Sequence, residues 1–167
     1  VIREGTFCFD PFDPTTPPAS CANTGPFGEP LLDPIMEYFH PISCTDNTQC
    51  AFLGVDCGVN GLCENEGGIA IVGGFVYRGS KFPELVGRYV FGDFAADFFA
   101  PSGRLYYFDT AGAEAFQRLQ FSIAPNNAPL GLFLKGFGED DQGELYVLAS
   151  LDLPPSGTSG VVLRITR

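Results

Sequence analysis

Apolar and polar residues alternate with the period of a β-strand through most of the second half of the chain. Residues 69–78 and 88–94 predict two neighbouring strands, because both runs are rich in Val, Phe and Tyr. Pro83 interrupts them, since it cannot donate a hydrogen bond to a strand ladder. The pair Gly73-Gly74 lies inside the first run and predicts a point where another backbone approaches closely.

The same period predicts further strands towards the end of the chain, at residues 103–109, 115–122, 132–138, 143–150 and 160–167. Residues 68–122 therefore predict a complete four-stranded unit with about the length of one propeller blade. Residues 123–167 predict three strands of a last blade. Because the fourth strand of this blade is missing, we expect an open sheet edge that another chain segment covers.

The first part of the chain has a different pattern. Prolines interrupt residues 1–30 at positions 11, 14, 17, 18, 26 and 30, which predicts an ordered loop. Residues 31–40 alternate in character and predict the outer strand of a preceding blade, so that residues 1–40 form one region. His40 stands at the end of that strand beside Pro41, where a hydrogen-bonding role is more typical than a catalytic one.

Composition favours an all-β fold with little helix. The 167 residues include 21 Gly, 14 Pro and 17 Phe but one Met. The net charge of −11 comes from 20 acidic and 9 basic residues, and it makes nucleic acid and anionic membrane surfaces poor partners. No apolar run is long enough to span a bilayer, and the start at Val1 without a leader predicts a mature or truncated form.

All six cysteines lie between Cys8 and Cys63, which predicts disulfide bonds and an oxidising compartment, either extracellular or periplasmic. A bond between Cys8 and Cys21 would hold the proline-rich loop. The other four cysteines, in residues 41–67, are separated by five, six and five residues. They stand too close together for a core to form between them, so cross-links must supply the order there. A zinc site of four thiolates is the remaining metal alternative.

This cysteine cluster resembles the small disulfide-stapled units of extracellular proteins, in which the first cysteine pairs with the third and the second with the fourth. That resemblance implies Cys44–Cys57 and Cys50–Cys63, although three pairings are possible among four cysteines.

Several segments together resemble the C-terminal portion of the glucose/sorbosone dehydrogenase family. They read IREGTFCFDP, DPIMEYFH, GGFVYRGSKFPELVGRYVFGDF, GRLYYFD, GEDDQGELYVL and GVVLRI. The family comprises six-bladed β-propellers, among them soluble quinoprotein sugar dehydrogenases and Hedgehog-interacting-protein-like proteins. The resemblance implies a partial propeller of about two blades with a disulfide-stapled insert at residues 41–67. Six blades need about 240 residues, so we expect a fragment whose open edges the remainder of the propeller or another chain covers.

The resemblance also implies cofactor chemistry in the parent protein. Quinoprotein members bind pyrroloquinoline quinone (PQQ) with Ca²⁺, and the candidate cofactor-binding residues here are Asp93 and Arg78. Where such enzymes place a lysine that contacts the quinone, this chain has Ala95. Where they place arginines near the cofactor, it has residues 132–134, LFL, with Lys135 as the only nearby cation. We expect no cofactor on this chain alone.

Each candidate carboxylate also has a structural interpretation. Asp93 ends a strand, where it would either line the channel of a propeller or bind backbone N–H groups, and Arg78 or Arg88 would pair with it. Two groups of polar residues would either hold Ca²⁺ or form tight turns. The first is Glu139, Asp140 and Asp141, and the second is Asp46, Asn47 and Asp56. We favour the turns, and we assign no metal site and no catalytic residue, since no Ser-His-Asp or Cys-His set is present.

Two functions follow from these observations. The first is the C-terminal part of an exported sugar or aldose dehydrogenase-like propeller, whose parent oxidises sugar carbinols and has a sugar ligand. The alternative is a non-enzymatic extracellular propeller that acts as a binding or assembly module, which the residues at 95 and 132–134 favour.

Overall fold

A computed structural model describes residues 2–10, 12–13, 18–40, 43–51, 56–58, 61, 63, 68–109, 117–118, 130–154 and 156–165. The chain divides into two compact units, Val1–Glu37 and Tyr38–Arg167. The all-β class is confirmed, because helix in the described residues is confined to single turns such as η1 (Asn47–Gln49) and η3 (Pro83–Leu85). None of the described helices is long and apolar enough to cross a bilayer. The predicted divisions after residues 40, 67 and 122 stay predictions.

The first unit contains a hairpin that the sequence pattern did not predict. Strands β1 (Ile2–Glu4) and β2 (Phe7–Phe9) pair antiparallel across a two-residue turn that begins with Gly5, whose φ is +61°. Glycine at the first central position of such a turn matches the twist of the flanking strands, and this was the signal available in the sequence. Thr6 of the turn donates hydrogen bonds from its backbone N (2.8 Å) and Oγ1 (2.6 Å) to the Glu37 carboxylate.

The strand predicted at residues 31–40 is wrong. These residues are described, and they form no strand. Leu32 and Ile35 are both exposed, so the alternation has no buried face, and none of the described strands pairs with these residues. Pro34 also removes one of the donors that a ladder would use.

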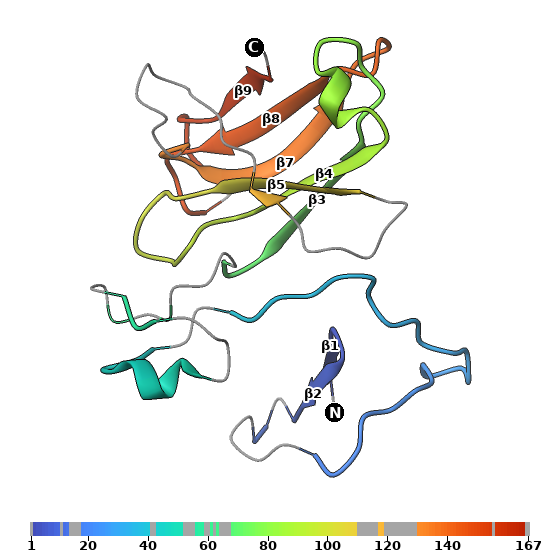
Figure 1. Cartoon of the computed structure of the whole chain (residues 1–167), viewed down its shortest axis with the longest axis vertical. Coiled ribbons are helices and arrows are strands. Elements are labelled where there is room, and N and C mark those ends of the chain that lie inside the picture. The colour runs from blue at the N-terminus through green and yellow to red at the C-terminus, as the bar shows by residue number, and fades with distance from the viewer. Residues whose placement is uncertain are drawn as a thin grey trace. The chain divides into compact units, whose positions relative to one another are not determined.

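The second unit contains a four-stranded antiparallel sheet in the order β3-β4-β5-β6, shown in Figure 1. Its strands are β3 (Ile71–Val76), β4 (Arg88–Asp93), β5 (Arg104–Asp109) and β6 (Gln117–Arg118). All four begin within the predicted runs. Of the predicted strand at residues 115–122, only 117–118 lie inside the described residues.

The Gly-Gly pair behaves as the sequence predicted. The register between β3 and β4 shifts between Val72 and Phe75, which makes a bulge at Gly73-Gly74. A Cβ atom on Gly74 would lie 1.9 Å from the carbonyl oxygen of Val90, so no side chain fits there. The bulge therefore lets the two backbones approach closely.

A second antiparallel sheet has three described strands, in the order β7-β8-β9. They are β7 (Phe133–Glu139), β8 (Leu145–Ser150) and β9 (Val161–Arg164), in the positions that the sequence predicted. The two sheets share two apolar clusters, one around Leu105, Leu134 and Val147, the other around Tyr77, Val90 and Leu145. A Cβ on Gly92 would lie 2.2 Å from Leu134, which shows how tightly β4 and β7 pack. The result is a pair of blade-like sheets, a propeller-like arrangement.

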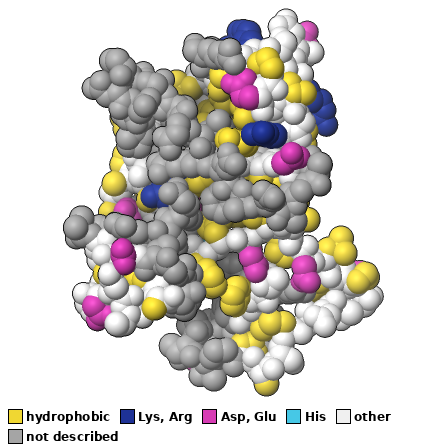
Figure 2. Space-filling model, viewed as in Figure 1, with side chains coloured by type: hydrophobic (Ala, Val, Ile, Leu, Met, Phe, Trp, Pro, Cys, Tyr) yellow, Lys and Arg dark blue, Asp and Glu magenta, His cyan; other side chains and the backbone are white. Residues whose placement is uncertain are grey.

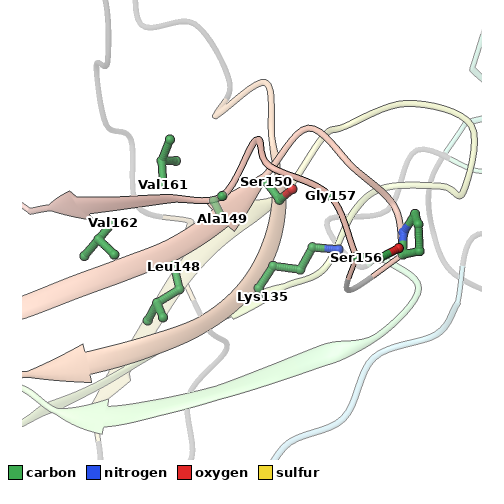
Figure 3. A pocket seen from close by; sticks show the side chains of 10 residues that line it. Lys135, Leu148, Ala149, Ser150, Ser156, Gly157, Val161 and Val162 are labelled. Carbon is green, nitrogen blue, oxygen red and sulfur yellow. The ribbon is translucent and has the colours of Figure 1, made fainter.

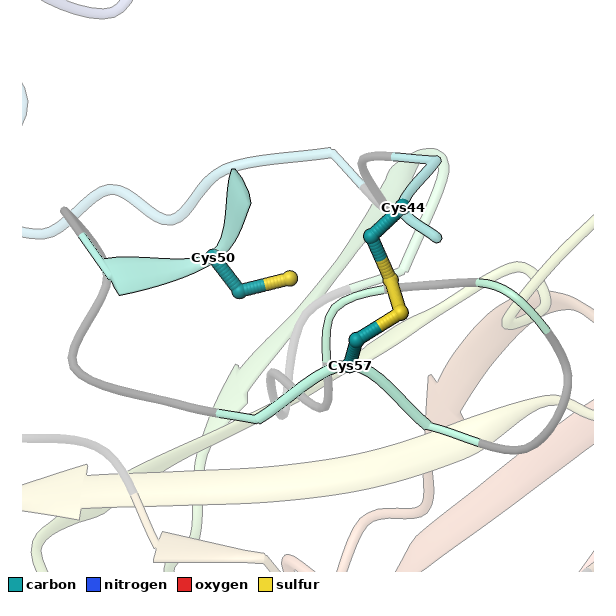
Figure 4. A group of neighbouring side chains, drawn as sticks. All are labelled: Cys44, Cys50 and Cys57. Carbon is teal, nitrogen blue, oxygen red and sulfur yellow. A yellow bond between two sulfur atoms is a disulfide. The ribbon is translucent and has the colours of Figure 1, made fainter. Parts of the chain in front are cut away.

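Three disulfides link the cysteines, in the pairs Cys8–Cys21, Cys44–Cys57 and Cys50–Cys63. The sulfur atoms of Cys44, Cys50 and Cys57 lie within 4.8 Å of one another (Figure 4), but each belongs to a disulfide. Cys44, Cys50 and Cys63 are themselves the buried centre of this insert. Cross-links thus supply its order, as expected for a segment without a larger apolar core.

Polar side chains complete the insert. Asp46 caps η1 by accepting hydrogen bonds from Thr48, and these bonds lower the pKa of its carboxyl group. Asn47 donates to Asp56 (2.7 Å) and accepts from the backbone N of Cys57 (2.9 Å). These three side chains therefore form caps and turn contacts, which was the interpretation favoured from the sequence.

Candidate functional site

Asp93 lies at the end of β4 and is completely buried. Its Oδ1 accepts hydrogen bonds from the backbone N atoms of three residues, namely Ile69 (3.0 Å), Ala95 (3.1 Å) and Ala70 (3.4 Å). Its Oδ2 accepts a short hydrogen bond from the Tyr38 hydroxyl. The carboxylate thus binds backbone N–H groups at a strand end. Its role as a cofactor ligand stays a prediction.

Tyr38 is a donor in this contact. Burial raises the pKa of its phenol group well above the ordinary value, and the neighbouring Asp93 carboxylate raises it further. The hydroxyl therefore stays protonated and can donate at any physiological pH. The Tyr38 ring also contacts the ring of Tyr106 on β5, with centroids 6.4 Å apart.

These contacts fasten both ends of the disulfide-stapled insert to one carboxylate. Tyr38 precedes the insert, while Ile69 and Ala70 follow it, and all three donate to Asp93. A Cβ on Gly68 would lie 2.2 Å from Asp93 Oδ1, so the returning chain passes directly over the carboxylate. Asp93 therefore fixes the base of the insert against the end of the first sheet.

The structure does not bring Asp93 together with Arg78 or Arg88. In the strand register Ile71 is opposite Asp93, whereas Arg88 lies at the other end of β4. Arg78 follows the far end of β3, about 20 Å along the strand direction from Ile71, and its guanidinium donates to the Val76 carbonyl (3.2 Å). The expected pairing of Asp93 with either arginine is wrong, because the two ends of a strand pair cannot meet.

At this opposite end lies Glu144, which the sequence did not single out. It is 1% exposed and links the two sheets. Its Oε2 accepts from the Tyr77 hydroxyl (2.8 Å), and its Oε1 accepts from the backbone N atoms of Ser80 (3.0 Å) and Lys81 (3.1 Å). Burial would raise the pKa of Glu144, but these hydrogen bonds and the Lys81 charge outweigh it and lower the pKa. The carboxylate stays charged and holds the hairpin loop of the first sheet.

The acidic turn before Glu144 is built around Asp140. Its Oδ1 accepts from the backbone N atoms of Glu144 (2.9 Å) and Gln142 (3.0 Å), and its Oδ2 accepts from Tyr146 (3.2 Å) and lies 3.7 Å from Arg164. The bond from Glu144 is the main cause of a lowered Asp140 pKa. Among the described residues, the carboxylates of this turn form no metal-binding group.

Lys135 lies between the loop that follows β4 and the loop that follows β8, at the end of the sheets where Asp93 lies. The rings of Phe94 and Phe133 stack with their centroids 5.0 Å apart, and Lys135 Nζ lies 4.7 Å from the first centroid and 5.4 Å from the second. The same Nζ donates to the Leu153 carbonyl (2.8 Å). Nearby Ala95 is completely buried. The first of these positions therefore holds a small buried side chain at residue 95, and the second holds a lysine that contacts two rings and a carbonyl oxygen.

Beside Lys135 is a pocket of about 340 Å³, lined partly by Leu148, Val162 and Ser156. Figure 3 shows the Lys135 side chain extending towards the loop that carries Ser156. That loop is held by Ser159, which donates to Asp152 (2.6 Å) and contacts Ser150 (2.9 Å). The pocket thus has apolar strands on one side and a hydrogen-bonded loop on the other.

The fold and these contacts define a disulfide-linked, propeller-like module with two blade-like sheets. It shares part of its sequence with Hedgehog-interacting protein. The chain is 36% identical over 83 residues to that protein from Mus musculus and equally to that from Homo sapiens. Each match covers 48% of this chain and 11% of the relative, so the chain matches about a tenth of the relatives' length. No protein-family model and no solved structure matches the chain.

Proposed function

We propose that this chain is part of an extracellular, propeller-like module that binds another protein and carries out no redox chemistry. The similarity to Hedgehog-interacting protein over about half of the chain is the observation that carries this proposal. The three disulfides support an extracellular location, since such bonds persist in oxidising compartments. Hedgehog protein is accordingly the first partner to test.

The residues at the Asp93 end support a binding role over a quinone site. Ala95 stands where the resembling enzymes place a lysine, and its backbone N donates to Asp93 while its carbonyl accepts from Ile69 (3.1 Å). Lys135 is engaged by two aromatic rings and a carbonyl. Both positions thus serve internal packing, so neither supplies the charge that would steady a quinone oxygen.

The second candidate function is the C-terminal part of a sugar or aldose dehydrogenase that uses PQQ and Ca²⁺. The segment GGFVYRGSKFPELVGRYVFGDF favours it, because this run carries the most specific resemblance to that family. In such a protein Asp93 and Arg78 would be the cofactor-binding candidates. Because these two residues lie at opposite ends of the β3–β4 pair, a single cofactor would contact only one of them.

Two titrations separate these functions, the first with the purified, oxidised chain and the second with the longer parent protein that the dehydrogenase function assumes. In the first, immobilised chain is exposed to purified Hedgehog protein, and we expect saturable binding. In the second, PQQ and Ca²⁺ are added with a sugar and an electron-accepting dye, and we expect neither a changed quinone absorbance nor dye reduction. Sugar-dependent dye reduction without binding of Hedgehog protein would favour the dehydrogenase function instead.

A further inference from the structure

Two phenylalanines stand out from the loop between β4 and β5. Phe98 is 62% exposed and Phe99 is 97% exposed. A single exposed apolar residue needs no explanation, but two adjacent aromatic rings cost free energy in water that a partner would recover. Aromatic side chains are also the residues that most often dominate the energy of protein interfaces.

The loop that carries these rings is held in place. Asp97 Oδ1 accepts hydrogen bonds from the backbone N atoms of Phe99 (2.7 Å) and Ala100 (3.1 Å). Ser102 Oγ accepts from the backbone N of Ala96 (3.0 Å) and donates to the Ala100 carbonyl (3.0 Å). Because the loop is already ordered, binding through it would lose little conformational entropy.

A second apolar loop is connected to the first. Leu151 is 58% exposed and Leu153 is 43% exposed, and both follow β8. Lys135 joins the two loops, since its Nζ lies over the Phe94 ring and donates to the Leu153 carbonyl. In Figure 1 both loops lie on the same side of the two sheets, opposite the turn between β7 and β8.

The charge around these loops favours a basic partner. Asp97 and Asp152 lie within them, and both carboxylates accept hydrogen bonds from residues of the same loops. The Lys135 charge is directed into aromatic rings. The chain as a whole carries −11, and Figure 2 shows acidic side chains exposed on the face in view. A basic rim on a partner would therefore be attracted.

Further blades would leave these loops uncovered. The two sheets contact each other through their faces, with β3 and β7 closest. Blades added around a propeller pack in that same way, whereas the loops project from the strand ends. A rigid scaffold that presents loops at one end is also the usual arrangement of a binding site.

We propose that Phe98, Phe99, Leu151 and Leu153 form a docking surface, here called the Phe98 surface, for a protein partner with an apolar patch bordered by Lys or Arg. The proposal rests on the proposed binding function and specifies the surface that performs it. Phe98 and Phe99 are the anchors, and the two leucines extend the apolar area beside them.

The test selects ligands without assuming a natural partner. A phage-displayed library of random 12-residue peptides is panned on the oxidised chain, and each enriched peptide is synthesised. Its affinity is then measured for the wild type, for Phe98→Ser/Phe99→Ser and for Val86→Ser. Val86 is a matched control because it is 56% exposed but lies in the loop before β4, at the opposite end of the strand.

We expect enriched peptides to combine apolar residues with Lys or Arg and to bind the double serine variant at least about tenfold more weakly than the wild type. Val86→Ser should bind like the wild type, and added NaCl should weaken binding. Failure to enrich any peptide, or peptides that bind the double serine variant equally well, would overturn the Phe98 surface. Hedgehog protein is absent from this experiment, so its result is separate from the test of the proposed function.

Discussion

Glu144 accepts a hydrogen bond from the hydroxyl of Tyr77 at 2.8 Å, across 67 residues of sequence. The Tyr77 hydroxyl in turn accepts from the backbone N of Phe82 (3.0 Å). Both side chains are almost fully buried. Since Tyr77 directly follows β3 and Glu144 directly precedes β8, this contact ties the two blade-like sheets together at the end opposite Asp93.

Replacing Tyr77 by Phe should therefore destabilise the chain. The variant keeps the ring but removes the hydroxyl that donates to the buried Glu144 carboxylate and accepts from the half-buried N–H of Phe82, which costs about 1–3 kcal/mol. Urea unfolding followed by fluorescence measures the difference. Tyr146→Phe is the matched control, since that hydroxyl makes a longer bond of 3.2 Å in a half-buried place and should lose less.

Acid should weaken the same link. The pKa of Glu144 is lowered in the folded chain, so its charged form contributes stability at pH values above its ordinary pKa of 4.5. That contribution disappears as the pH falls through the lower, folded-state pKa. Urea midpoints measured between about pH 6 and pH 3 should fall more steeply for the wild type than for Glu144→Gln. Equal slopes for the two proteins would contradict a role of this carboxylate in stability.

The bulge in β3 predicts a difference in stability between two Gly→Ala variants. Gly74→Ala would place a Cβ 1.9 Å from a backbone oxygen, which cannot move without disturbing β4. We expect a loss of about 1–3 kcal/mol, the usual cost of overpacking. Gly136→Ala is the control, because its Cβ would lie 4.0 Å from Leu148 in ordinary contact. Similar urea midpoints for the two variants would show that the bulge is not tightly packed.

Asp93 should keep the base of the disulfide-stapled insert from opening locally. Asp93→Asn removes the charge that strengthens these hydrogen bonds, and the amide nitrogen facing the Tyr38 hydroxyl no longer accepts the bond that this hydroxyl donates. We expect amide hydrogen exchange of Ile69 and Ala95 to rise by about tenfold or more, because local opening becomes easier. Tyr38→Phe leaves the backbone contacts intact and should raise exchange less. If exchange at these amides were unchanged in Asp93→Asn, the anchoring role would be wrong.

The strands of the two sheets were predictable because their alternation matches a real buried face. Val90 and Tyr107 face the second sheet, while their neighbours Phe91 and Tyr106 contact each other across the other face. Residues 31–40 alternate too, but no strand in the described part of the chain buries one side of them, and the strand prediction failed there. Alternation predicts a strand only where another element supplies the packing.

The candidate sites depend on contacts between distant residues, and these are not contained in a local pattern. The sequence indicated Asp93 because it ends a strand, but it did not indicate that Tyr38 would meet it. Glu144 looked like an ordinary residue after a turn, although a Glu that opens an apolar strand is a weak signal of a buried carboxylate. The expected contact of Asp93 with Arg78 failed because strand register places them at opposite ends.

Binding of Hedgehog protein tests the central claim most directly. The oxidised wild-type chain is immobilised, and surface plasmon resonance is recorded over a concentration series of purified Hedgehog protein. A disulfide-reduced sample serves as the control for non-specific adsorption. We predict saturable binding with a dissociation constant of about 1 μM or tighter that is lost in the reduced sample. A flat response from a chain whose three disulfides are intact would contradict the proposed binding function.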